Sequence, residues 1–200
     1  MSPALLLLAA APLAVAGGAL SMTVDLRARP DAPVATVRCY TSGMRVAVAT
    51  DHRAPWTGAT LVFDGGQRHD PAGKRGLAHL TEHLQFQAEL DGVRLADRIA
   101  GLGLEMNAYT SAEVTVWPLE GPTPRLGAML GLHASRMKAG ALPGVDADRL
   151  AQEKAAVMHE RADRGFSLAH AASDWLTPHV YPEGLPPLPR GPETAASVDA

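Results

Sequence analysis

The sequence has little cysteine, few aromatic residues and no excess of positive charge. A single cysteine, Cys39, stands among 200 residues, so no disulfide can form within the chain. Phe, Trp and Tyr make up 4% of the residues. The formal net charge is −3 and no basic block is present, which argues against nucleic acid as a partner. Cys39 falls in an expected strand, and we expect it to be a small core residue.

Long apolar runs are also lacking, except at the N-terminus. Met1–Met22 carries no charged side chain and contains the run Leu5–Leu8. Its triplet Ala14-Val15-Ala16 fits a small-x-small cleavage site, so residues 1–22 are interpreted as a signal peptide. The alternative is a retained N-terminal membrane anchor, because the run approaches the length of a spanning helix. We therefore expect a protein exported to the periplasm or secreted, with no other membrane span.

The motif that carries chemistry is His79-Leu80-Thr81-Glu82-His83. On an α-helix, His79 and His83 share one face, about 6 Å apart along the axis, so both imidazoles can bind one metal ion. Imidazole suits Zn²⁺, and Glu82 is placed to act as a general base on a nearby water. The order is that of the inverted zinc-peptidase signature. The remaining histidines show no ligand spacing, and most are expected on loops or helix surfaces: His52, His69, His133, His170 and His179.

Periodicity and turn residues predict a mixture of strands and helices after the N-terminal segment. The length suffices for one core-bearing domain. The expected strands are Val34–Tyr40, Met44–Thr50, Ala59–Asp64, Leu104–Thr110 and Glu113–Leu119, the first two forming a hairpin. The expected helices are Lys74–Leu90, Gly92–Gly101, Pro124–Ala139 and Ala147–Arg164.

Two glutamates on the last expected helix are candidates for the rest of a metal site. Glu153 and Glu160 are seven residues apart, which places them two turns apart on one face. A carboxylate on such a stripe either pairs with another group or binds metal. Helix statistics alone favour the alternative of two solvated glutamates on an amphipathic helix.

Several blocks together resemble the insulinase/pitrilysin family of zinc peptidases. The matching blocks, in order, are Ser42–Val46, Asp51–Pro55, Asp70–Phe86, Asn107–Ser111 and Glu153–Arg161. The resemblance implies an α+β fold, a mostly antiparallel sheet packed with helices, which forms the first half of a two-domain clamshell. It implies a zinc-dependent endopeptidase that cleaves extended peptides.

The resemblance also implies roles for individual residues. His79, His83 and Glu160 would hold one Zn²⁺ per chain, and Glu82 would be the base. Glu153 would orient one of the metal-binding side chains without binding the metal itself. Asn107, Ala108, Tyr109 and Thr110 would lie on an edge strand to which a peptide substrate adds as a further strand. For that segment, the alternative is an ordinary buried strand.

Family members need a second half to hold their substrate. Residues 30–200 resemble the N-terminal catalytic domain, incomplete at its C-terminal end. We therefore expect either a fragment or a chain whose partner supplies the missing half. The alternative functions are a non-catalytic or partner-dependent subunit of a two-chain peptidase and a metal-binding structural module.

Overall fold

The computed structural model describes most of the chain between Leu20 and Gly165. The described residues are 20–24, 35–53, 55–71, 73–74, 76–138 and 142–165, with 172 and 176 as single positions; for 20–24 and 161–165 the description covers the backbone alone. The chain divides into two compact units, Met1–Pro55 and Trp56–Ala200. The metal motif lies in the second unit.

The first unit contains a three-stranded antiparallel sheet. Its strands are β1 (Leu20–Val24), β2 (Ala35–Cys39) and β3 (Arg45–Ala49), in the order β1-β2-β3. The predicted hairpin of β2 and β3 is confirmed, whereas β1 was not expected, because its first residues fall in the apolar segment interpreted as a leader. Cys39 is free and only partly buried, so its expected place in the core is wrong.

The central strand of the sheet in the second unit is β9 (Thr115–Pro122). Strand β4 (Trp56–Phe63) pairs antiparallel with β9 over its whole length. On the other side of β9 lie two short strands, β7 (Glu105–Met106) and β8 (Tyr109–Thr110). The single strand expected at Leu104–Thr110 is therefore divided in two. Its interruption coincides with a local hydrogen bond, in which the Asn107 side-chain oxygen accepts from the Ala108 N–H at 2.8 Å.

All four expected helices are present, each shorter than or close to its expected length. They are α1 (Leu77–Gln87), α2 (Leu95–Gly101), α3 (Leu126–Arg136) and α4 (Ala147–Gly165). Short elements complete the unit: η1 (Gln67–His69), β5 (Glu89–Leu90), β6 (Val93–Arg94) and η2 (Thr123–Arg125). The antiparallel sheets and packed helices confirm the α+β class. Among the described residues, no helix combines the length and the apolar character needed to cross a bilayer.

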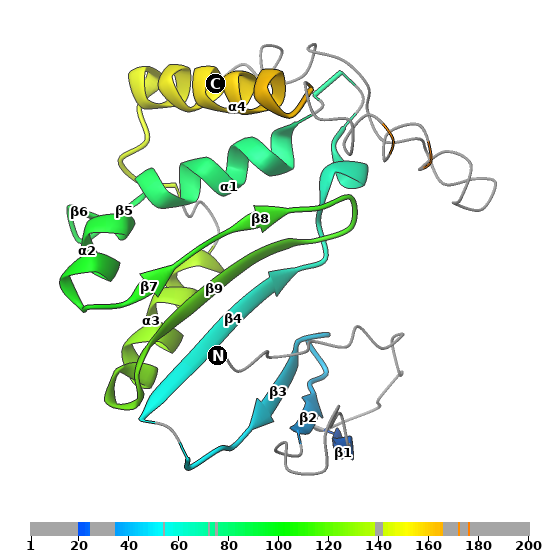
Figure 1. Ribbon diagram of the computed structural model, residues 1–200, viewed down its shortest axis with the longest axis vertical. Coiled ribbons are helices and arrows are strands. Elements are labelled where there is room, and N and C mark those ends of the chain that lie inside the picture. Colours follow the sequence, from blue (N-terminus) through cyan, green and yellow to red (C-terminus); the bar gives the residue numbers. More distant parts are fainter. Residues whose placement is uncertain are drawn as a thin grey trace. The chain divides into compact units, whose positions relative to one another are not determined.

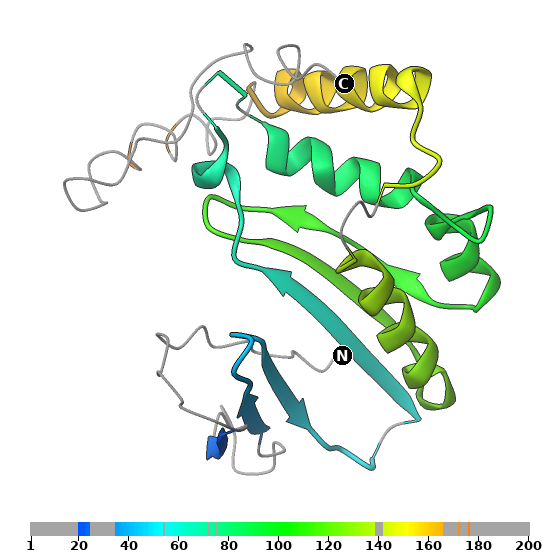
Figure 2. The same cartoon turned by 180° about the vertical axis from the view of Figure 1, so that it is seen from behind.

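Two apolar clusters position these elements. The larger one packs α2 and α3 against the sheet, through Ala59, Leu95, Ile99, Leu104, Leu119, Met129 and Leu132. The smaller one joins α1 to α4, through Leu80, Leu84 and Val157. In Figure 1, α4 runs alongside α1, and α1 runs alongside β8. Figure 2 shows α3 lying against β4 and β9.

The start of α1 is fixed by a side chain from the preceding loop. The Asp70 carboxylate accepts hydrogen bonds from the backbone N–H groups of Gly76 (2.6 Å) and Ala78 (2.8 Å). Gly76 has a φ of 88°, a left-handed conformation that favours glycine. A carboxylate at this end also complements the helix dipole. The helix therefore begins at Leu77 rather than at Lys74, and both metal-motif histidines lie within its regular part.

His133 is buried, which contradicts its expected place on a loop or helix surface. It lies on α3 with 5% of its surface exposed, and its Nε2–H donates to the Ala59 carbonyl at 3.0 Å. Burial lowers the pKa of His133, the hydrogen bond to Ala59 opposes this shift, and the positive charge of Arg136 adds to it. The folded protein therefore holds this imidazole neutral.

The neutral state of His133 makes folding stability depend on pH. Below the unfolded-state pKa of about 6.5, the unfolded chain binds a proton that the folded chain does not, so stability falls as the pH drops. His133→Gln keeps a hydrogen-bond donor but does not titrate. Urea denaturation at pH 7.5 and 5.0 should show a smaller loss of stability in His133→Gln than in the wild type. The exposed-site control His52→Gln should behave as the wild type; equal pH dependence in all three proteins would contradict the assignment.

Candidate metal centre

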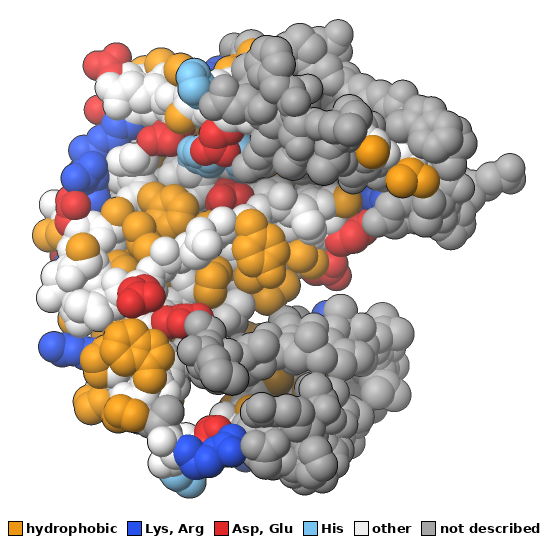
Figure 3. Space-filling model, in the orientation of Figure 1, with side chains coloured by type: hydrophobic (Ala, Val, Ile, Leu, Met, Phe, Trp, Pro, Cys, Tyr) orange, Lys and Arg blue, Asp and Glu red, His pale blue; other side chains and the backbone are white. Residues whose placement is uncertain are grey.

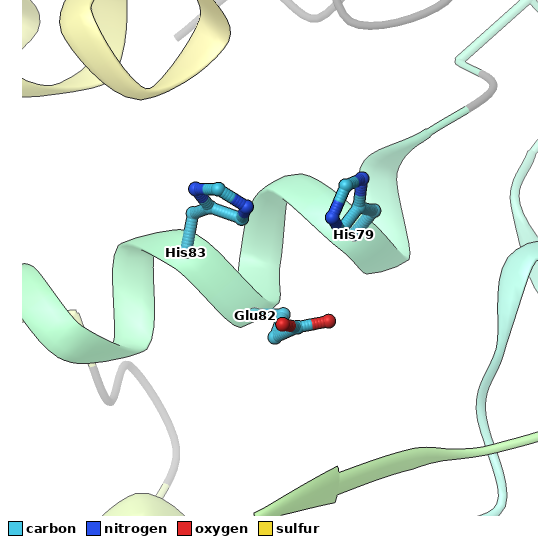
Figure 4. A group of neighbouring side chains, drawn as sticks. All are labelled: His79, Glu82 and His83. Carbon is cyan, nitrogen blue, oxygen red and sulfur yellow. The ribbon is translucent and has the colours of Figure 1, made fainter. Parts of the chain in front are cut away.

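Helix α1 brings both imidazoles of the motif to one side of the helix. The ring centroids of His79 and His83 are 4.9 Å apart, with an angle of 84° between the ring planes. Figure 4 shows the two rings on the same side of α1, with Glu82 projecting from an adjacent side. His79 and Glu82 are buried, and His83 is half-buried. One donor atom from each of the three residues lies within 4.8 Å of the others.

Helix α4 brings the carboxylate of Glu160 to both imidazoles. Glu160 Oε2 is 3.5 Å from His79 Nε2, and Oε1 is 3.4 Å from His83 Nε2. Zinc bonds of 2.0–2.1 Å in a tetrahedral arrangement separate neighbouring donor atoms by about 3.3–3.4 Å. The two separations between Glu160 and the imidazoles are close to this value and are compatible with a shared divalent ion. The two helices contribute residues that are distant in the sequence.

Glu153 fixes the orientation of one imidazole. Its Oε2 accepts a hydrogen bond from His83 Nδ1 at 3.0 Å, provided that Nδ1 carries the proton. That tautomer leaves the lone pair of His83 Nε2, the atom beside Glu160, available to a metal. The other oxygen, Glu153 Oε1, accepts from Gln87 Nε2 at 2.7 Å.

Gln87 is a site residue that the sequence pattern did not reveal. Its position four residues after His83 places it on the same face of α1. Its amide holds the carboxylate that in turn holds His83. The spacing was the only available signal, because the partner, Glu153, lies 66 residues away.

Glu82 faces the sheet, where a threonine contacts it. Thr110 Oγ1 on β8 donates to Glu82 Oε2 at 2.5 Å. Thr110 Oγ1 is also 3.4 Å from Thr115 Oγ1, which donates to the Gly65 carbonyl at 2.7 Å. This contact fixes the orientation of the Glu82 carboxylate. Thr110 was expected on a substrate-binding strand, and its bond to Glu82 was not predicted.

The segment Asn107–Thr110 lies at the outer edge of the sheet. The Asn107 N–H donates to the Pro118 carbonyl at 3.2 Å, and β8 pairs with β9. Within the described part of the chain, no strand pairs with the opposite side of β8. Tyr109 is exposed. This edge runs alongside α1, the helix that carries the metal motif.

The donor set fits a divalent transition metal. Two imidazole nitrogens and a carboxylate oxygen are the ligands found in catalytic zinc sites, which keep a further position open. The expected residues His79, His83, Glu153 and Glu160 are close together, with Glu82 on the adjacent side of α1. His170 and His179 lie outside the described residues.

The sequence profile of insulinase (peptidase family M16) matches residues 45–175 of the chain. The mitochondrial-processing peptidase subunit beta of Homo sapiens is 27% identical over 154 residues, which cover 74% of this chain and 30% of that protein. The subunit beta of Rattus norvegicus is 28% identical over 182 residues, covering 86% and 35%, respectively. The chain thus spans about a third of the length of these curated relatives.

Solved structures show the same fold. A protease from Helicobacter pylori has a TM-score of 0.58 at 25% identity, covering 66% of this chain and 32% of that chain. Pitrilysin has a TM-score of 0.56 at 24% identity, covering 72% and 16%. A peptidase M16 inactive domain from Pseudomonas fluorescens has a TM-score of 0.63 at 21% identity, covering 82% and 39%. The profile match extends over more than half of the chain and includes the metal motif, and on this evidence the chain belongs to the insulinase family, peptidase family M16.

Proposed function

We propose that this chain carries the catalytic zinc site of an endopeptidase that hydrolyses peptide bonds in extended peptides. The observation that carries this proposal is the position of Glu160, whose two oxygens lie 3.5 and 3.4 Å from the Nε2 atoms of His79 and His83. If Glu153 and Glu160 were only solvated residues of an amphipathic helix, they would not be expected to lie beside two imidazoles of another helix. Membership of a peptidase family supports the same reaction.

His79, His83 and Glu160 would hold one zinc ion. Glu153 would keep His83 in the tautomer that presents Nε2, and Gln87 would hold Glu153 in turn. A zinc ion held there supplies Lewis acidity, which activates water for attack on a carbonyl carbon at neutral pH.

Glu82 would act as the proton carrier of the reaction. Its carboxylate takes a proton from the attacking water and passes it to the departing amine. The 2.5 Å hydrogen bond from Thr110 holds Glu82 in one orientation before substrate arrives. The Glu82 residue is 6% exposed, so bulk water competes little for its carboxylate.

The edge formed by Asn107, Ala108, Tyr109 and Thr110 would bind the substrate backbone. An extended peptide that adds to this edge pairs through its main chain, which makes recognition largely independent of side chains. Because Thr110 also contacts Glu82, a peptide on this edge lies next to the proposed base.

The complete enzyme would contain more than this chain. The chain spans about a third of the length of the curated relatives, which are named as subunits. A second half-domain or a partner chain would therefore complete the substrate-binding cleft. The second candidate function, a non-catalytic or metal-binding module, is supported by the structural likeness to an inactive peptidase M16 domain.

Replacing the proposed base should separate metal binding from catalysis. Glu82→Gln should retain about one zinc per chain and lose peptide cleavage by a factor of about 10² or more, because proton transfer is lost. Cleavage of an unstructured fluorogenic peptide is measured on the chain assembled with its completing half or partner, and zinc by mass spectrometry. Glu120→Gln, on β9, is the matched control and should cleave as the wild type. Undiminished cleavage by Glu82→Gln would remove this residue from its role.

Replacing the proposed third ligand should affect metal binding directly. Glu160→Gln should weaken zinc affinity by at least about 10–100-fold, the loss typical even of a residue that only hydrogen-bonds a metal-binding side chain. Competition with a fluorescent chelator measures this change on the chain alone, with Asp148→Asn at the start of α4 as the control. The opposite pattern, in which Glu82→Gln loses zinc and Glu160→Gln retains it, would show that Glu82 is the ligand.

A further inference from the structure

Arg136, the last residue of α3, is a buried cation without a hydrogen-bond partner. The residue is 5% exposed, and burial lowers its pKa to about 10. None of its three guanidinium nitrogens has a hydrogen-bond partner. Its Cζ lies 5.7 Å from the ring centroids of Phe86 and Trp117. Aromatic faces attract a cation, but they leave the in-plane N–H donors of the guanidinium unsatisfied.

Arg136 forms part of the wall of a pocket of about 370 Å³. Most of the surrounding surface comes from apolar side chains, including Phe63, Leu77 and Trp117. The indole Nε1 of Trp117 is a second buried donor without a hydrogen-bond partner. An apolar pocket bordered by a few polar side chains is the usual arrangement of a small-molecule site. Arg136 and Trp117 offer only donors, so a ligand that pairs with them must accept hydrogen bonds.

The charges around the pocket restrict what it binds. Among the described lining residues, Arg136 is the one arginine or lysine and Asp70 the one carboxylate. Asp70 is engaged by the backbone of α1, and its negative charge remains near the pocket. With one cation and one anion in the lining, a singly charged anion is favoured over a phosphate or a dicarboxylate. A carboxylate matches the planar fork of a guanidinium.

We propose that this pocket binds a monocarboxylate with an aromatic or branched apolar stem. In this proposal the stem packs among Phe63, Leu77 and Trp117, and the Arg136 side chain reorients so that its guanidinium donates to the carboxylate. Free carboxylic acids and the C-terminal residue of a peptide share this chemistry.

The pocket is distinct from the metal centre. Four residues of α1 line it, and they lie on the side of the helix turned away from His79 and His83: Leu77, Ala78, Thr81 and Gln85. The inference therefore does not depend on the proposed peptidase reaction. Binding is measured on the chain itself, without a partner and without catalysis.

Isothermal titration calorimetry with phenylacetate tests the proposal. The wild type should bind about one phenylacetate per chain, and phenylacetamide, its neutral isostere, should bind at least about tenfold more weakly because its acceptor carries no charge. Arg136→Met, which has similar length and no charge, should lose at least about tenfold in affinity for phenylacetate. Arg125→Met, an exposed arginine before α3, should bind as the wild type.

Two further arms separate the remaining outcomes. The peptide Ala-Ala-Phe and its C-terminal amide distinguish a peptide carboxylate from a free acid. If Ala-Ala-Phe with a free carboxylate binds more tightly than phenylacetate, the site is assigned to peptide C-termini. If phenylacetate binds more tightly, the site is assigned to free acids. Should Arg136→Met fail to fold, Arg136→Lys and Trp117→Phe replace it, and both should weaken phenylacetate binding. No binding by the wild type, equal binding of acid and amide, or unchanged binding in the folded variants would overturn the proposal.

Discussion

The packing of α1 against α4 is the contact on which the candidate site depends. Leu80 and Leu84 on α1 meet Val157 on α4, and two of these three side chains are completely excluded from solvent. Burying side chains of this size contributes about 1.5–3 kcal/mol each, which fixes the two helices relative to each other. Glu153 and Glu160 flank Val157 along the same helix, so the apolar contact carries both carboxylates to the imidazoles. The arrangement of the candidate metal site is thus a consequence of a hydrophobic interface between two helices.

Hydrogen bonds orient the side chains that the apolar contact between α1 and α4 brings together. Asp70 fixes where α1 begins, Glu153 and Gln87 orient His83, and Thr110 orients Glu82. Each is a hydrogen bond to a charged or potentially charged group, the stronger class in proteins. The bond from Thr110 also links the helix to the edge strand. A shift of β8 would therefore move the hydrogen-bond donor of Glu82. The position of the edge strand and the orientation of the Glu82 carboxylate are thus coupled.

Local patterns in the sequence were enough to predict the helices and most strands, because α1 and α4 have clear apolar periodicity and the β2–β3 hairpin has a glycine turn. Long-range contacts were not accessible in this way. The family resemblance, rather than any local pattern, indicated that Glu160 meets His79. Nothing in the local sequence distinguished His133, buried against the Ala59 carbonyl, from a surface histidine. Strand β1 was missed because a small, apolar run reads equally well as a leader or a strand, and the choice depends on its pairing with β2.

X-ray absorption spectroscopy at the zinc K-edge, on the zinc-loaded chain, can show whether two imidazoles of α1 and a carboxylate of α4 bind one ion. We expect two imidazole ligands at about 2.0–2.1 Å, with the remaining scatterers all oxygen. One oxygen contribution should change when Glu160 is replaced by alanine. A spectrum with fewer than two imidazoles, or one that is identical in the Glu160→Ala variant, would contradict this arrangement.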